Sequence, residues 1–269
     1  MRTRGARLEA VGLLTGWGEG VEALPADARV AAAGRGVIPL ARPVLDGDRF
    51  RRATRECLLG VVAVEAMLRD AGIDRQAIRG SGTALVFVTA AAYGASNIAW
   101  LAAQAGTLHF PYTAPSVLPG EVAIEFGLTG PYVILIGGAT ATVDGIWQVG
   151  RMIAGGQCER ALVLTVETFV ECEMLWRRAR WTLPGPLVET AACALVGPGD
   201  TPPAYRATAA AAPLELEVDR RVGRTLACAP LAGCALARAA ASRTAVVSGT
   251  WRGRTAAVEV AIAQRPVRA

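Results

Sequence analysis

The sequence contains no lysine and only one histidine, and these two absences exclude much of the chemistry that an enzyme can use. Without lysine there is no Schiff-base amine, no anchor for pyridoxal phosphate and no phosphate-binding lysine of a Walker A loop. With His109 alone, any Ser-His or Cys-His pair would have to use that one residue. The net charge of +5 therefore comes entirely from arginine.

The cysteines form no Cys-x-x-Cys pair, and only one histidine could complete a metal site with them. This spacing argues against structural zinc, and we expect no metal and no cofactor. Most of the cysteines stand in apolar or alanine-rich segments, so we expect reduced, buried thiols that pack as small hydrophobic side chains. They are Cys57, Cys158, Cys172, Cys193, Cys228 and Cys234.

No continuous run of about 18 uncharged apolar residues occurs, so we expect no membrane span. The basic residues 1–7 lead into a mixed segment rather than an apolar run, which argues against a signal peptide. Hydrophobic residues make up 52% of the chain and charged residues 19%, as in a packed globular protein. We expect a cytoplasmic protein.

Apolar runs of strand length alternate with segments of helical periodicity along the first 200 residues. Continuous apolar strands need cover on both faces, so the alternation predicts an α/β sheet layered by helices. Strands are expected at 8–18 (with its turn), 83–89, 132–136, 160–168 and 189–196, the last folding back on the strand before it. Helices are expected at 49–72, 96–105, 120–126 and 142–154.

The last quarter of the chain has a different composition. Residues 201–212 are rich in proline and alanine, and we interpret them as a linker. Leu214–Val218 and residues 244–262 look rich in β-structure. The second of these segments predicts a hairpin with Gly253 in its turn.

The middle of the chain carries several short motifs in a fixed order. Pro111-Tyr-Thr-Ala-Pro115 precedes Gly127-Leu-Thr-Gly-Pro131, an apolar strand at 132–136, and Gly137-Gly-Ala139 with Asp144 five residues later. This order resembles the middle of a β-ketoacyl synthase, where such a loop and helix end lead into the strand before the nucleophile. The family places a cysteine where this chain has Ala139. An alanine methyl can neither attack a thioester nor hold an acyl group.

The resemblance covers roughly residues 1–199 and is most specific between Pro111 and Thr168. It implies a thiolase-like layered α/β fold with a complete N-terminal half. Residues 200–269 would then be a strongly shortened C-terminal half, with the linker and a closing β-hairpin, inside a single compact domain. The family's second half carries two catalytic histidines, and this chain has no histidine beyond His109.

Loss of the nucleophile together with both histidines indicates a chain without catalysis of its own. In this superfamily, non-catalytic subunits called chain-length factors form heterodimers with an active ketosynthase, and this chain resembles the short ones of aryl-polyene and related type II polyketide pathways. The resemblance implies a subunit that shapes the partner's acyl tunnel in polyketide, aryl-polyene or fatty-acid-like biosynthesis, with an acyl carrier protein as a further partner. Two alternatives stay open: a divergent thioesterase or acyltransferase that uses a water or a displaced cysteine, and a stand-alone acyl-binding scaffold.

The strand and the corner after it are the expected subunit interface. By the resemblance, the strand of Tyr132, Ile134 and Ile136 lies beside its counterpart in the partner. Gly137 and Gly138 would allow a close approach of another backbone. Without the resemblance, a plain internal strand explains the same residues equally well. The corner could host a carbonyl at the N–H groups of the next helix, or neighbouring side chains could fill it.

The resemblance gives a role to a loop and to one tyrosine. His109, Phe110 and Thr113 lie on the loop that in the family crosses the subunit interface and walls the partner's acyl tunnel. Tyr93 falls near the position that gates the end of the acyl pocket. Each residue also has a plainer interpretation, as a satisfied structural histidine, a loop residue or a core aromatic.

Residues 175–181 place three arginines between two tryptophans. Arg177, Arg178 and Arg180 could dock an acidic carrier protein, because a basic rim steers an acidic partner. Binding of nucleic acid through phosphates and base stacking is an alternative, but no nucleic-acid motif accompanies the cluster, so we expect no such partner. A solvated helix face whose tryptophans pack inward also explains the pattern.

Overall fold

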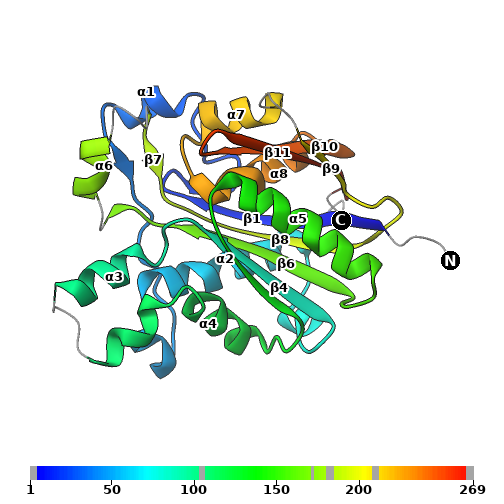
Figure 1. The fold of residues 1–269 in the computed structure, drawn as a ribbon, viewed down its shortest axis with the longest axis horizontal. Coiled ribbons are helices and arrows are strands. Elements are labelled where there is room, and N and C mark those ends of the chain that lie inside the picture. The colour runs from blue at the N-terminus through cyan, green and yellow to red at the C-terminus, as the bar shows by residue number, and fades with distance from the viewer. Residues whose placement is uncertain (1–4, 103–106, 171–172, 180–184, 208–211, 265–269) are drawn as a thin grey trace.

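A curled sheet of strands from both ends of the chain forms the frame of the protein. The computed structural model describes residues 5–102, 107–170, 173–179, 185–207 and 212–264, and within them the sheet has nine strands. Its order is β10 (Thr244–Trp251), β11 (Arg254–Ile262), β1 (Gly5–Thr15), β8 (Thr190–Gly199), β6 (Arg160–Glu167), β4 (Thr83–Thr89) and β5 (Tyr132–Ile136) (Figure 1). Two short strands join it, β2 (Gly18–Glu19) beside β1 and β9 (Ala204–Ala207) beside β11.

The strands β4, β5 and β6 run parallel, so their carboxyl ends meet at one edge of the sheet. Strand β8 lies antiparallel to β6, from the pair Ala161–Val196 to the pair Glu167–Thr190. The predicted fold-back of this strand is therefore confirmed. A separate parallel pair, β3 (Val37–Ile38) and β7 (Leu187–Val188), lies beyond these strand ends.

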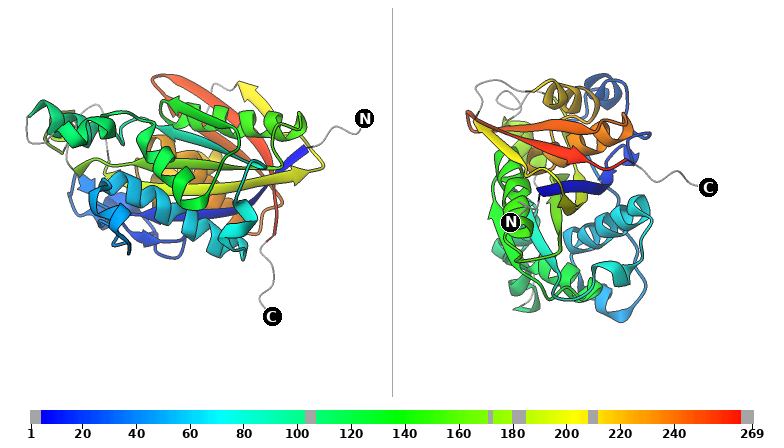
Figure 2. Two further views of the ribbon diagram at one scale, coloured as in Figure 1. Left: turned by 90° about the horizontal axis from the view of Figure 1, so that it is seen from below. Right: turned by 90° about the vertical axis from the view of Figure 1, so that its right-hand side faces the viewer.

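Helices cover both faces of the sheet (Figures 1 and 2). On one face, α2 (Arg55–Ala71) and α4 (Val117–Phe126) pack on Phe87 of β4 and Leu164 of β6. On the other face, α5 (Ala139–Ala154) and α8 (Ala229–Ala239) pack on the alternate residues Val86 and Val163. Because side chains alternate along a strand, fully apolar strands serve both cores at once.

The first predicted helix, 49–72, is divided in two. Residues Asp48–Arg52 form a 3-10 helix, and Ala53 is extended, so that α2 begins afresh behind its N-cap Thr54. The Thr54 hydroxyl accepts from the backbone N–H of Cys57 at 3.4 Å. The helix ends at Gly72, whose φ of +67° is the left-handed cap that glycine adopts at least cost.

The shorter helical elements connect these layers. They are α1 (Ala28–Ala32), α3 (Gly94–Leu101), α6 (Glu173–Ala179), α7 (Pro213–Arg221), and the 3-10 segments η2 (Arg75–Ile78), η3 (Thr107–Thr113) and η5 (Leu226–Cys228). Among the described helices, none is long and apolar enough to cross a membrane.

The β-structure predicted at Leu214–Val218 is wrong, because these residues lie in α7. Pro213 starts the helix and Glu215 stands in its first turn, both of which favour a helix N-terminus. Leu214 and Val218, four residues apart, share one face and pack against Gly233 of α8. The sequence analysis assigned no element to α8, and the linker interpretation of 201–212 missed β9.

The predicted hairpin is confirmed. Strands β10 and β11 pair from Thr244–Ala261 to Trp251–Arg254, and both turn residues, Arg252 and Gly253, have positive φ. The hairpin packs on α5 and α8, and both helices also pack on β1 and β8, so the two helices lie between the hairpin and these strands. Within the described residues, the hairpin joins the other strands of the sheet where β11 pairs with Arg7 and Leu8 of β1.

A buried ion pair joins the C-terminal elements to the rest of the protein. Arg238 of α8 is 4% exposed, and its Nε donates to the Asp70 carboxylate of α2 at 2.9 Å. The same carboxylate oxygen accepts from the backbone N–H of Val11 at 3.0 Å. One core cluster also contains residues from both parts, among them Val163 and Val247.

Candidate functional site

The carboxyl ends of β4, β5 and β6 and the N-terminus of α5 meet in one region. Thr89 ends β4, and its carbonyl accepts from the N–H of Gly137, the first residue after β5, at 2.9 Å. Glu167 ends β6 and is fully buried. The predicted corner therefore lies at the carboxyl ends of three parallel strands.

The corner itself is filled. Ala139 is the first residue of α5 and is 5% exposed. A β-carbon added at Gly138 would lie 2.3 Å from ring carbons of Trp251. A β-carbon added at Gly249 would lie 2.6 Å from the Ala139 methyl. Of the two possibilities that the sequence left open, hosting a carbonyl and filling by neighbours, the structure supports the second.

Strand β5 forms one end of the sheet order. It pairs with β4 on one side, and among the described residues no strand lies on its other side. Tyr132 is 42% exposed and Ile136 is 52% exposed, while Ile134 is half-buried. The Tyr132 hydroxyl donates to the carbonyl of Ser116 at 3.1 Å, so this side chain is held against the start of α4.

The predicted interface loop is the 3-10 segment η3, packed beside α3. Asn97 joins the two, since its amide donates to the carbonyls of Tyr93 at 2.9 Å and Thr113 at 3.3 Å. Phe110 is 60% exposed, and its ring lies 5.4 Å from that of Trp100. The backbone of His109 lies in η3, but its side chain is outside what the structure describes.

A narrow cavity opens between α2, β4, α3 and the start of α4. Its volume is about 20 Å³, enough for roughly one or two waters. Tyr93 lines it, whereas Phe110 and Thr113 do not. The remaining walls include Thr54, Glu56, Cys57, Phe87, Tyr112 and Leu118.

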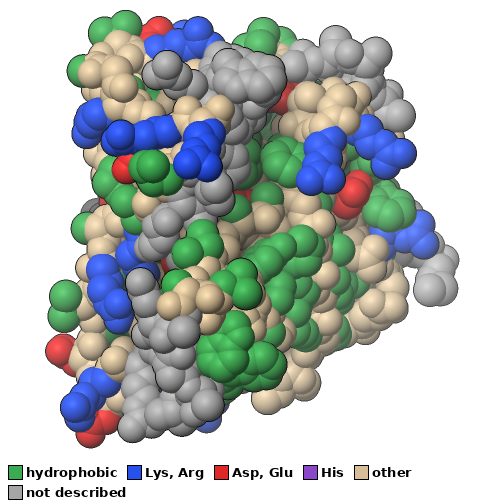
Figure 3. Space-filling view, turned by 60° about the vertical axis from the view of Figure 1, so that its left-hand side comes forward, with side chains coloured by type: hydrophobic (Ala, Val, Ile, Leu, Met, Phe, Trp, Pro, Cys, Tyr) green, Lys and Arg blue, Asp and Glu red, His purple; other side chains and the backbone are tan. Residues whose placement is uncertain are grey.

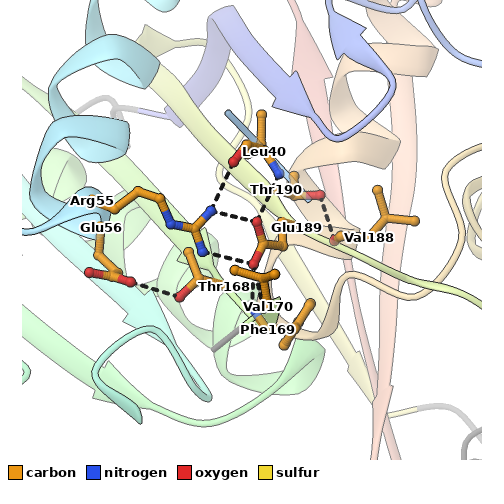
Figure 4. Close-up of polar contacts among 9 residues, drawn as sticks. All are labelled: Leu40, Arg55, Glu56, Thr168, Phe169, Val170, Val188, Glu189 and Thr190. Carbon is orange, nitrogen blue, oxygen red and sulfur yellow. Dashed lines mark hydrogen bonds and ion pairs between the residues drawn. The ribbon is translucent and has the colours of Figure 1, made fainter. Parts of the chain in front are cut away.

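Two fully buried glutamates, Glu167 and Glu189, lie at this end of the sheet, and neither was predicted as a site residue. Glu189 forms a two-pronged ion pair with Arg55, at 2.6 Å and 2.9 Å, and accepts backbone N–H groups of Leu40, Phe169 and Val170 (Figure 4). Burial alone would raise its pKa, but the Arg55 guanidinium and these N–H donors hold the pKa below its usual value.

Among the described residues, no cation hydrogen-bonds to Glu167. Its oxygens accept from the backbone N–H groups of Ala90 at 2.6 Å, Ala91 at 2.9 Å and Ala227 at 3.3 Å. Burial raises the pKa of this carboxyl to about 8 despite those donors. A charged residue at the end of an otherwise apolar strand was the sequence signal that could have drawn attention to it.

The described cysteines do not supply a ready nucleophile. Burial raises the pKa of Cys57 and of Cys234 to about 12 and also raises that of Cys193 and Cys228. A thiol with a raised pKa holds little thiolate at neutral pH. Cys172 lies outside the described residues. Within those residues, no group of His, Cys, Asp and Glu side chains could hold a metal ion.

The predicted docking arginines lie partly within the described chain. Arg177 and Arg178 are exposed on α6, where Arg177 pairs with Glu173 at 2.9 Å, and Arg180 lies outside the described residues. Figure 3 shows one face with hydrophobic side chains gathered near its middle and arginines toward its left and upper margins. Large hydrophobic side chains exposed on α3, η3 and β5 are Ile98, Leu101, Phe110, Tyr132 and Ile136.

Comparison with known proteins gives a consistent picture. A family model described as the N-terminal domain of β-ketoacyl synthase matches residues 43–183. The fold is similar to that of the ishigamide ketosynthase/chain length factor, with a TM-score of 0.70 and 17% identity over 96% of this chain and 100% of that one.

Two further solved structures share the fold. A type II polyketide ketosynthase in complex with its acyl-carrier protein has a TM-score of 0.68 and 13% identity, over 97% of this chain and 100% of that one. The 3-oxoacyl-(acyl carrier protein) synthase III of Pseudomonas aeruginosa has a TM-score of 0.57 and 16% identity, over 98% and 100%. No curated protein sequence matches significantly. The predicted thiolase-like layered α/β fold is thereby confirmed.

Proposed function

We propose that this chain, which belongs to the β-ketoacyl synthase family, is a non-catalytic subunit that forms a heterodimer with an active ketosynthase. The observation that carries the proposal is the pair of features at the end of the sheet. Ala139 begins α5 in a corner that Trp251 and Gly249 fill, and β5 beside it offers a free edge with exposed apolar side chains.

The free edge of β5 supports an interface role. An edge strand presents unpaired N–H and C=O groups, which another strand can satisfy. Native proteins commonly protect such an edge with lysine, proline or inward charges, and Tyr132-Val-Ile-Leu-Ile136 contains none of these. Exposed Tyr132 and Ile136 would add apolar burial to strand pairing across the subunits.

Several observations support the absence of catalysis. Ala139 carries no nucleophile, and the described cysteines are buried with raised pKa values where a shift is seen. The only histidine, His109, belongs to η3 rather than to the C-terminal elements, where the family carries its two catalytic histidines. These features also speak against a thioesterase or acyltransferase that uses a displaced cysteine.

The tunnel-shaping role would fall to the loop and to the cavity behind it. Tyr93 lines the cavity, and Asn97 ties its backbone to Thr113 of η3. We propose that His109, Phe110 and Thr113 wall the partner's acyl tunnel, as the family resemblance implies. Tyr93 and a cavity with space for roughly one or two waters would leave little room for an acyl chain inside this subunit.

The wider proposal includes an acyl carrier protein as second partner and a cytoplasmic place of action in polyketide, aryl-polyene or fatty-acid-like biosynthesis. Arg177 and Arg178, with Arg180, would form a basic rim for the acidic carrier. We also retain residues 1–199 and 200–269 as the two parts of one domain. The shared core and the Arg238–Asp70 pair support the single domain, because both join the two parts.

The test is co-expression with the ketosynthase encoded beside this chain, followed by native mass measurement. We expect a stable one-to-one complex. Ile136→Asp on β5 should weaken it at least about tenfold, because a carboxylate would be buried without a partner. Val246→Asp is the matched control, since Val246 is 40% exposed on β10, at the other end of the sheet order. A monomer without affinity for any ketosynthase would overturn the proposal.

A further inference from the structure

The corner before α5 is covered by a segment that is distant in the sequence, the tip of the β10–β11 hairpin. The indole of Trp251 lies against Gly138 so closely that an added β-carbon there would meet three ring carbons within 2.8 Å. The backbone of Gly249 approaches Ala139 in the same way, with an added β-carbon 2.7 Å from the Ala139 carbonyl oxygen. The hairpin therefore contacts two of the three corner residues, Gly138 and Ala139.

This approach depends on two glycines. Gly138 and Gly249 have no β-carbon, and Ala139 between them in space has only a methyl. A side chain at either glycine would force the hairpin away, because its β-carbon would lie 2.3 Å from ring carbons of Trp251 or 2.6 Å from the Ala139 methyl. The small residue at 139 is thus explained by packing as well as by lost chemistry.

Two neighbours hold the Trp251 ring in position. The ring lies against the backbone of Gly138, and the Arg252 guanidinium lies 5.7 Å from the ring centroid. Arg252 and Gly253 have φ of +49° and +76°, the geometry of a tight two-residue turn. Such a turn sets the direction in which the last residues of β10, Trp251 included, present their side chains.

We propose that Trp251 is a built-in plug that closes the N-terminus of α5 to an acyl thioester. The N–H groups at a helix start can stabilise a carbonyl or an oxyanion, and here an indole and the Gly249 backbone occupy the approach to them. One consequence rests on the proposed function: in the heterodimer, the plug confines the acyl group to the partner's pocket.

The test measures how accessible position 139 is to a small reagent. Ala139→Cys is treated with iodoacetamide, and alkylation at residue 139 is followed by peptide mass spectrometry. Reading the single peptide separates it from the native cysteines. Gln148→Cys is the reference, because Gln148 is an exposed residue of the same helix. Protein purified alone or with its ketosynthase serves equally, since the readout is alkylation and not activity.

With Trp251 in place, we expect alkylation at 139 at least about tenfold slower than at 148, because the hairpin must open first. Adding Trp251→Ala to Ala139→Cys should bring the two rates to within about threefold, while Trp251→Phe should keep position 139 slow. Equal rates at 139 and 148 with Trp251 present would overturn the plug, even if Trp251→Ala does not fold. Failure to bind a ketosynthase would overturn the heterodimer and leave this result unchanged.

Discussion

The surroundings of Glu189 and those of Glu167 make two neighbouring regions with opposite electrostatics. Both carboxylates are fully buried, at the ends of adjacent antiparallel strands, and each accepts backbone N–H groups. Of the two, Glu189 alone pairs with a cation of the described chain, Arg55. Its pKa lies below the usual value, whereas that of Glu167 is raised to about 8.

The comparison shows what backbone donors can and cannot do for a buried carboxylate. Three N–H groups and the Thr89 hydroxyl hydrogen-bond to Glu167, yet they do not offset the cost of removing its charge from water. Adding the guanidinium of Arg55 reverses the sign of the shift at Glu189. The two sites also do different structural work: Glu189 joins α2 to the loop at Phe169, and Glu167 joins β6 to η5.

The largest effect should come from removing the cation. Arg55→Met leaves Glu189 charged and buried without a counter-ion, and we expect a loss of about 3–5 kcal/mol in the free energy of unfolding. The measurement is urea or guanidinium denaturation at neutral pH. Arg49→Met is the matched control, because Arg49 pairs with Glu121 and Glu125 in more exposed surroundings, and its loss should cost about 0–1 kcal/mol.

A double variant sharpens this result. Arg55→Met combined with Glu189→Gln should be more stable than Arg55→Met alone, because the neutral amide is cheaper to bury and its oxygen can still accept N–H groups. If the double variant is the less stable of the two, the unpaired charge is not the cause of the loss.

The second prediction concerns pH, and it separates the two glutamates. A folded-state pKa raised to about 8 means that Glu167 contributes stability fully below its unfolded pKa, near 4.5, and that this contribution is lost as pH rises toward 8. Glu189 acts in the opposite direction. Its lowered pKa gives stability that is present above the unfolded value and lost as the pH falls through the lower, folded-state pKa.

Glu167→Gln should therefore flatten the fall in stability between pH 4.5 and 8, by up to about 1.4 kcal/mol per pH unit. It should leave the acid side, where Glu189 titrates, unchanged. Unfolding free energies measured across that range in both proteins test this. Identical pH slopes would show that Glu167 does not change its charge there.

The two sites also show which structural features could be predicted from the sequence and which could not. The apolar strands 83–89 and 132–136 were predicted at their exact bounds, because a continuous apolar run limited by glycine or threonine has few alternatives. The Gly253 hairpin was predicted because its turn chemistry is local. The corner at 137–139 was placed correctly at the junction of strand and helix, through motif order.

What filled that corner could not be predicted, because Trp251 reaches it only through the packing of the hairpin over α5. For the same reason, Glu167 and Glu189 were not singled out, since their partners at Ala90, Arg55 and Ala227 come from distant segments. Helix α7 was misassigned because Leu214-Glu-Leu-Glu-Val218 alternates apolar and acidic residues, as a strand does. Pro213 in the first turn and the packing of Leu214 and Val218 on Gly233 favour the helix instead.

The smallest predicted effect that still tests the contrast between Glu167 and Glu189 is at Thr89. Its hydroxyl donates to the Val166 carbonyl at 2.9 Å, accepts from Ala92 N–H at 2.9 Å, and lies 3.4 Å from a Glu167 oxygen. Thr89→Val keeps the shape but removes these bonds, for a loss of about 1–2 kcal/mol. Because a donor to the charged form is lost, the pKa of Glu167 should rise further, and the fall in stability should extend to higher pH. Thr89→Ser, which keeps the hydroxyl, should leave the pH profile in place; a shift with serine as large as that with valine would show that the methyl group, not the hydroxyl, holds this region.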